Sequence, residues 1–164
     1  KGLIKKKWNR KRPVIIFGCG GAAEAIIYFL KLENIENITV VNRTKKRAKE
    51  IIKKYRNINF TTDFDINVKE AGLIINTTSL GMIGYPDLKV NLNSTNKEII
   101  IYDIVYNPIN TKLIKEAKIQ KLQYISGLNM FIEQARSSFE IWFQINPEIN
   151  CNLINNIKKK IIKR

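Results

Sequence analysis

VIIFGCGGAAEAII, residues 14–27, predicts a buried β-strand, a glycine-rich turn and the start of an α-helix. Gly18 ends the strand and allows a tight turn, and Gly20 has no side chain, so the backbone can approach a pyrophosphate closely. Ala23 stands where a third glycine is usual and is small enough for the helix to lie against the sheet. The helix amino terminus offers free N–H groups and a partial positive charge to phosphates. The pattern predicts a dinucleotide-binding unit, and the alternative is a strand-to-helix turn without a ligand.

The second predicted strand runs into NRTKKR (42–47), which indicates the kind of dinucleotide that fits. NAD sites commonly place Asp or Glu here to bind the ribose 2′-hydroxyl, and a carboxylate would repel a 2′-phosphate. Arg43 and Arg47 can instead converge on one anion, because a guanidinium pairs well with phosphate. Asn42 and Thr44 can add hydrogen bonds. We therefore predict NADP rather than NAD. In the alternative interpretation, both arginines are surface cations and Thr44 only caps the next helix.

Size and composition exclude several classes of protein. The 164 residues, 45% of them hydrophobic, suffice for one globular domain. With no His and only two cysteines, the chain cannot form a zinc site, a His-based triad or a disulfide framework, so we expect no metal. No apolar run reaches the roughly 20 residues that span a membrane, and no signal-peptide pattern opens the chain. We therefore expect a cytoplasmic protein without a membrane partner.

The net charge of +15 is also typical of a nucleic-acid-binding protein. Lysines and arginines are spread throughout the chain, however, and cluster only at residues 5–12 and 158–164. We interpret these clusters as solvated ends and expect no specific nucleic-acid partner.

Apolar strands alternate with helical patterns along the whole chain. This alternation predicts an α/β fold with a doubly wound (Rossmann-like) open parallel sheet of about six strands and helices on both faces. We expect strands at 14–17, 37–41, 59–62, 73–76, 99–105 and 123–126. We expect helices at 22–32, 45–54, 66–71, 111–117, after Gly127 and after Pro147. The first helix should bury a face of Ala22, Ala25, Ile26, Phe29 and Leu30.

Three parts are expected in the chain. Residues 1–12 form the end of an inter-domain helix and a basic linker, and 13–145 form the dinucleotide-binding domain. Residues 146–164 form an amphipathic helix packing on or beside that domain. Five segments of the domain follow the carboxyl ends of strands: the glycine-rich turn, 42–44, 76–79, 102–107 and Gly127. Ligands bind at this edge in such sheets.

Five characteristic segments occur in order over nearly the whole chain: FGCGGAAEA, VVNRTKKRA, LIINTTSLGM, YDIVYNP and GLNMFIEQARSSFEIW. With these segments the sequence resembles the NADP-binding domain of the shikimate dehydrogenase family. The first two segments are shared with other dinucleotide-binding proteins, including glutamyl-tRNA reductase, and the last three are more specific. The resemblance implies NADPH-dependent reduction of 3-dehydroshikimate to shikimate by the intact enzyme, a step toward the aromatic amino acids.

The resemblance also implies roles for residues at the matching positions. The pyrophosphate would lie on Gly18, Gly20, Gly21 and Ala22, beside Ala23, and the 2′-phosphate on Asn42, Arg43, Thr44 and Arg47. Thr77 and Ser79 would lie beside the cofactor, Ile104 and Gly127 near the nicotinamide, and Tyr106 and Gln134 at the hydroxylated ring of the substrate.

The sequence departs from the family in two respects. By this resemblance, the family's amino-terminal substrate domain, which carries the catalytic lysine and its partner aspartate, is expected to lie outside these 164 residues, so we expect no catalytic residue in this chain. Asn129 replaces the glycine usual in GLGM. We expect the chain alone to bind NADP(H) with little or no turnover, while shikimate and quinate both stay open as substrates. The alternatives are an NADP-binding module without catalysis and the nucleotide domain of another dehydrogenase such as glutamyl-tRNA reductase.

Overall fold

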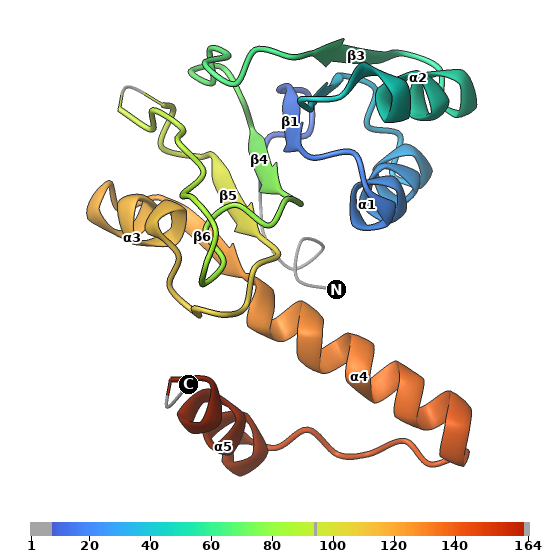
Figure 1. Cartoon of the computed structure of the whole chain (residues 1–164), viewed down its shortest axis with the longest axis vertical. Helices are drawn as coiled ribbons and strands as arrows, with labels where there is room; N and C mark the ends of the chain where they lie inside the picture. The colour runs from blue at the N-terminus through green and yellow to red at the C-terminus, as the bar shows by residue number, and fades with distance from the viewer. Residues whose placement is uncertain (1–7, 94, 163–164) are drawn as a thin grey trace.

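The computed structural model of the chain describes residues 8–93 and 95–162, and its core is a parallel sheet with helices on both faces (Figure 1). The strands are β1 (Val14–Phe17), β2 (Ile38–Val41), β3 (Ile58–Thr61), β4 (Leu73–Asn76), β5 (Ile100–Asp103) and β6 (Gln123–Ser126). The helices are α1 (Gly21–Leu32), α2 (Lys45–Lys54), α3 (Lys112–Ile119), α4 (Gly127–Phe143) and α5 (Cys151–Ile162). Among the described residues, the six strands lie in the order β3-β2-β1-β4-β5-β6, with every pair parallel. The predicted doubly wound fold is confirmed.

The centre of the sheet is buried on both faces because β1 is apolar at every position and β4 is apolar up to its last residue, Asn76. Along β1, Val14 and Ile16 face one core and Ile15 and Phe17 face the other. Helices α1 and α2 cover the first face, and α3 covers the second together with the segments around residues 68–71 and 88–92. Such continuous apolar strands are characteristic of parallel sheets with helices on both sides.

The predicted buried face of α1 was wrong in part. Ala23 and Ile27 are fully buried with Leu30, whereas Ala22 and Ala25 are exposed. Ile26 and Phe29 are half-buried against the same core. The glycine turn sets where the helix begins, and this places Ala23 rather than Ala22 against the sheet. The close approach predicted for Ala23 is confirmed, because its side chain has no exposed surface.

The predicted helix at 66–71 does not form. Asp63 Oδ1 accepts a hydrogen bond from the backbone N–H of Asp65, and Asn67 Oδ1 accepts one from Lys69. Such local bonds from Asp and Asn stabilise turns in competition with a helix.

The strand expected at 99–105 ends two residues sooner than predicted, at Asp103. There the Val105 N–H donates to Asp103 Oδ1 instead of to a neighbouring strand. The expected helix end at residues 1–7 lies outside the described residues.

Helix α4 leaves the sheet and extends away from it, and a loop leads back to α5 (Figure 1). The first two turns of α4 are anchored by Gly127, Leu128 and Ile132, which are buried. Farther along, Trp142 is 75% exposed, and α5 has no buried residue. Within residues 8–93 and 95–162, no helix is both long and apolar enough to cross a membrane.

Candidate functional site

The loops that follow β1, β2, β4 and β5 meet at one edge of the sheet. All these strands are parallel, so their carboxyl ends lie together, and β1 pairs with β2 on one side and β4 on the other. The chain order reverses direction between β1 and β4, and open α/β sheets bind ligands in the crevice at such a switch point. The architecture alone therefore selects this edge.

The glycines of the first loop serve different purposes. Gly18 has a φ of +107°, and a Cβ there would collide with Thr77 Oγ1 and lie 3.1 Å from the Thr77 carbonyl carbon. The protein's own packing thus requires glycine at this position. A Cβ on Gly20 or Gly21 would meet nothing within 4 Å. The open space at Gly20 and Gly21 lies at the start of α1, whose amino-terminal N–H groups receive no side-chain cap from Gly20.

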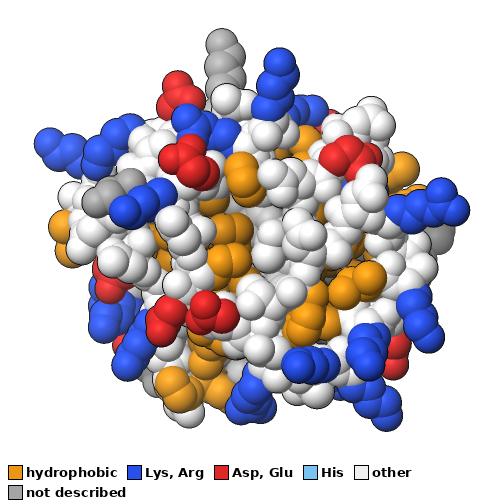
Figure 2. Space-filling model, turned by 90° about the horizontal axis from the view of Figure 1, so that it is seen from above, with side chains coloured by type: hydrophobic (Ala, Val, Ile, Leu, Met, Phe, Trp, Pro, Cys, Tyr) orange, Lys and Arg blue, Asp and Glu red, His pale blue; other side chains and the backbone are white. Residues whose placement is uncertain are grey.

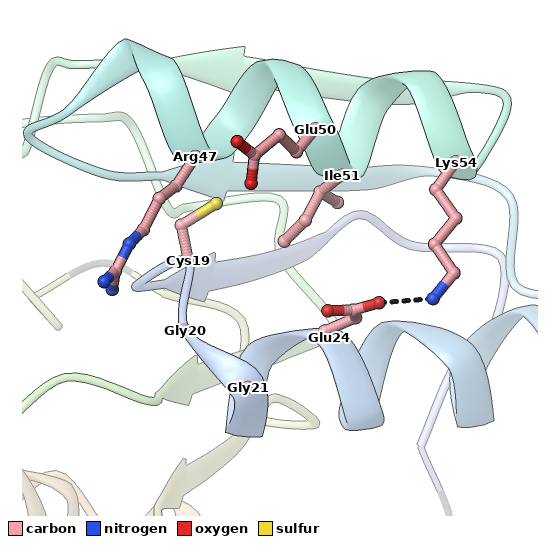
Figure 3. A pocket seen from close by; sticks show the side chains of 8 residues that line it. All are labelled: Cys19, Gly20, Gly21, Glu24, Arg47, Glu50, Ile51 and Lys54. Carbon is pink, nitrogen blue, oxygen red and sulfur yellow. Dashed lines mark hydrogen bonds and ion pairs between the residues drawn. The ribbon is translucent and has the colours of Figure 1, made fainter.

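A cavity of about 440 Å³ lies between this loop and α2 (Figure 3). Its lining consists of Cys19, Gly20, Gly21, Glu24, Arg47, Glu50, Ile51 and Lys54. Lys54 forms an ion pair with Glu24 across the cavity. Burial raises the pKa of the Cys19 thiol, although the Arg47 guanidinium acts to lower it. The thiol is therefore uncharged near neutral pH. The other two charged side chains that line the cavity are Arg47 and Glu50.

The turn after β2 is shaped by its own side chains. Asn42 is half-buried, and its Nδ2 donates to the Thr44 carbonyl at 2.9 Å. Thr44 occupies the cap position of α2, but its side chain makes no capping hydrogen bond. Arg43 and Arg47 are exposed, and among the described residues neither has an ion-pair partner. Arg47 lines the cavity and Arg43 does not.

Thr77 joins the loop after β4 to the loop after β1. Its backbone N–H and its hydroxyl both donate to the Phe17 carbonyl, at 2.8 and 2.7 Å. Ser79 lies two residues farther along the same loop and is exposed. The structure thus brings Thr77 next to the glycine turn, as its predicted place beside the cofactor requires.

A buried polar cluster lies beneath these loops and was missed in the sequence. Asn76 and Asp103 end β4 and β5, Thr111 caps α3, and all three are at most 2% exposed. Asp103 accepts hydrogen bonds from Thr111 Oγ1 at 2.6 Å, from Asn76 Nδ2 at 3.0 Å and from the Val105 N–H at 3.0 Å. Burial raises the pKa of Asp103, while these three donors act to lower it. A polar residue at the end of each of two neighbouring apolar strands was the available signal.

On the other side of the crevice, the loop after β5 meets the start of α4. Gly127 is buried against the backbone of Ile104, and a Cβ there would overlap the Ile104 carbonyl and lie 2.7 Å from Val105 O. The Tyr106 ring, 37% exposed, stacks on Phe131 of α4 with 4.3 Å between ring centroids. Gln134 lies one turn after Phe131 and is exposed. These residues therefore share one side of the site.

On the face drawn in Figure 2, charges of both signs are mixed. Figure 2 shows lysines and arginines around the rim of one face, with acidic side chains among them. In the described part of the chain, no group of three His, Cys, Asp or Glu side chains is arranged to hold a metal ion.

Comparison with known proteins identifies the family. Residues 3–123 match the family model described as shikimate/quinate 5-dehydrogenase, and residues 127–151 match the shikimate 5′-dehydrogenase C-terminal domain. The shikimate dehydrogenase (NADP(+)) of Ruegeria sp. (strain TM1040) is 37% identical over 147 residues, which cover 87% of this chain and 53% of that relative.

Solved structures agree with this match. A shikimate dehydrogenase in complex with NADP+ is 32% identical with a TM-score of 0.73, covering 93% of this chain and 54% of the other. The enzyme from Thermotoga maritima is 32% identical with a TM-score of 0.68, covering 93% and 57%. The chain thus spans about half the length of the relatives that it matches. These matches favour this family over glutamyl-tRNA reductase, and the chain belongs to the shikimate/quinate dehydrogenase family.

Proposed function

We propose that this chain is the NADP(H)-binding half of a shikimate dehydrogenase, which reduces 3-dehydroshikimate to shikimate. The observation that carries the proposal is the pair Gly20 and Gly21. Within residues 8–93 and 95–162, no atom lies within 4 Å of where their Cβ atoms would stand, and this space lies at the amino terminus of α1, which has no side-chain cap. A diphosphate fits such a place because N–H groups and the helix dipole both favour an anion.

The preference for NADP over NAD rests on Arg47. This residue lines the cavity next to Gly20 and Gly21, without an ion-pair partner among the described residues. Glu24, the acidic neighbour on α1, is neutralised by Lys54. A 2′-phosphate on Arg47 would thus meet an available guanidinium, with Arg43 and Thr44 exposed at the same turn to add contacts.

The other predicted residues divide between cofactor and substrate. Thr77 and Ser79 would border the cofactor, and Ile104 and Gly127 would lie near its nicotinamide. Tyr106, fixed by its stacking on Phe131, and Gln134 would contact the substrate ring. When bound, the nicotinamide supplies or accepts the hydride that interconverts ketone and alcohol. No residue of this chain is assigned the proton transfer, which the family resemblance gives to a lysine of the substrate domain.

Efficient turnover is proposed to need that further domain. This chain covers only about half the length of its relatives. In addition, α4, the loop that follows it and α5 expose large apolar side chains: Phe139, Ile141, Trp142, Phe143, Ile145 and Leu153. Apolar surface of this extent is typical of a contact with another protein part. In this proposal residues 13–145 are the cofactor domain, 1–12 are the linker to the substrate domain, and 146–164 form a helical segment on or beside the cofactor domain.

The test is a fluorescence titration of the purified chain with NADPH and with NADH, repeated for Arg47→Ala, Arg43→Ala and Lys53→Ala. Lys53 is exposed on α2 and does not line the cavity, so its variant controls for the loss of one positive charge. We expect Arg47→Ala to weaken NADPH binding about tenfold or more, the size of a lost hydrogen bond to a charged group. NADH binding should be unchanged.

Equal loss of NADPH affinity in Arg47→Ala and Lys53→Ala would mean that charge alone attracts the cofactor, which would contradict the assigned pocket. Appreciable shikimate-dependent NADPH formation by the isolated chain would contradict the need for a second domain.

A further inference from the structure

The cluster of Asn76, Asp103 and Thr111 connects three segments of the site edge that are far apart in the sequence. Asn76 ends β4, Asp103 ends β5, and Thr111 is the N-cap of α3. Asp103 uses both carboxylate oxygens: Oδ1 accepts from Asn76 and the Val105 N–H, and Oδ2 accepts from the Thr111 hydroxyl. The carboxylate is therefore the common acceptor for all three segments.

Asn76 carries this connection into the loop after β4. Its Nδ2 also donates to the Leu80 carbonyl at 2.9 Å, and its Oδ1 accepts from the N–H and the hydroxyl of Thr78. The Thr78 hydroxyl in turn accepts from the Leu80 N–H at 3.0 Å. The side chain of Asn76 thus fixes both ends of the segment that presents Thr77 and Ser79.

On the other side, the cluster fixes the start of the loop that presents Tyr106. The Val105 N–H is held by Asp103, and the Ile104 N–H donates to the Asn76 carbonyl at 3.1 Å. Tyr106 follows directly and rests on Phe131. A buried hydrogen bond that loses one partner leaves the other unsatisfied, so a change at one member disturbs the rest of the cluster.

We propose that Asp103 is a positioning residue which, with Asn76 and Thr111, couples the loop of Thr77 and Ser79 to the loop of Tyr106. None of the three cluster side chains needs to touch a ligand. The cluster holds the two sides of the crevice in one arrangement, so a change at the start of α3 alters the stability of the loop after β4. The effect of this coupling on binding rests on the proposed NADP(H) function, whereas the coupling itself does not.

The test uses Thr111→Val, Thr111→Ser and Leu113→Ala. The Val variant keeps the shape of Thr111 and loses its hydroxyl, and the Ser variant keeps the hydroxyl. Leu113 is buried on α3 at 2% exposure outside the cluster, so Leu113→Ala destabilises the same helix without removing a cluster bond. Amide hydrogen exchange is measured at Thr78, Leu80 and Val105 relative to β2, together with NADPH affinity and thermal stability.

We expect Thr111→Val to speed exchange at Thr78, Leu80 and Val105 by about fivefold, the effect of one lost hydrogen bond. The NADPH dissociation constant should rise by about the same factor, and Thr111→Ser should restore both values. Leu113→Ala should lower the melting temperature without either effect. Exchange changes confined to α3 in Thr111→Val would overturn the proposal.

Failure of the proposed function would give a different result. If the wild-type chain does not bind NADPH, the function is wrong, yet the exchange rates still decide whether the coupling exists. If NADPH binds and Thr111→Val weakens it no more than Leu113→Ala does, the cluster only stabilises the fold, and the positioning role is refuted.

Discussion

Replacing Gly127 by Ala should damage the fold through a collision with backbone atoms. The added Cβ would overlap the Ile104 carbonyl and lie 2.7 Å from Val105 O. Non-bonded heavy atoms attract best at about 3.5–4.0 Å, so these contacts are strongly repulsive. No side-chain rotation relieves them, because all the neighbours are main chain. Either α4 or the loop after β5 must move.

The expected loss of stability follows from two opposing contributions. Overpacking a buried site costs about 1–3 kcal/mol, and a clash with backbone belongs at the upper end. Alanine is favoured over glycine in a helix by about 1 kcal/mol, which offsets part of that cost. The net loss is about 2 kcal/mol, which corresponds to a fall in melting temperature of about 4–8 °C for a chain of this size. Thermal unfolding followed by circular dichroism measures it.

Gly21→Ala is the matched control for this prediction. Gly21 begins α1 as Gly127 begins α4, but a Cβ at Gly21 would meet nothing within 4 Å. Gly21→Ala should therefore melt at or slightly above the wild-type temperature. If Gly127→Ala melts as high as Gly21→Ala, the steric reasoning about the junction of α4 with the loop after β5 is wrong.

Three further outcomes are expected. Gly20→Ala should keep the wild-type melting temperature, because its Cβ meets nothing, but lose most NADPH affinity in a fluorescence titration; unchanged affinity would remove the pyrophosphate from this loop. Burial raises the pKa of Asp103, so the folded state retains a proton that the unfolded state loses above pH ~4. Its contribution to stability therefore falls as pH rises from about 4 through the raised pKa, and urea titrations should show Asp103→Asn removing that part of the pH profile. Trp142→Glu should leave the melting temperature of this chain within about 1 °C, since the side chain is 75% exposed, but abolish activity in a full-length enzyme; unaffected activity would argue against a docking role.

Much of the fold could be predicted from the sequence because local and global signals agree. The strands expected at 14–17, 73–76 and 123–126 coincide with β1, β4 and β6, and the helix expected at 45–54 coincides with α2. Parallel pairing followed from the alternation of strands and helices. Because the carboxyl ends of parallel strands lie at one edge of a sheet, the predicted site residues could be placed at that edge from the sequence alone.

Other features depend on three-dimensional contacts that no local pattern shows. The buried face of α1 depends on how the glycine turn sets the helix against β1 and β2. Leu30, and Ala23 for its small size, were assigned to the buried side correctly, whereas Ile27 was missed. The Asn76–Asp103–Thr111 cluster joins residues up to 35 positions apart, and single polar residues at strand ends do not reveal their partners. A helix after Gly127 was expected, but the sequence did not show that its second half, including Phe139 and Trp142, stays exposed.

The most direct measurement of the central claim is an NMR titration of the ¹⁵N-labelled chain with NADP+. We predict saturable shifts at the backbone amides of Gly20, Gly21, Arg47 and Thr77, which lie along the carboxyl edge of the sheet. Amides at the opposite edge, such as those of Asn37 and Asn96, should not move. Shifts confined to that opposite edge, or no shifts with millimolar NADP+, would contradict the account.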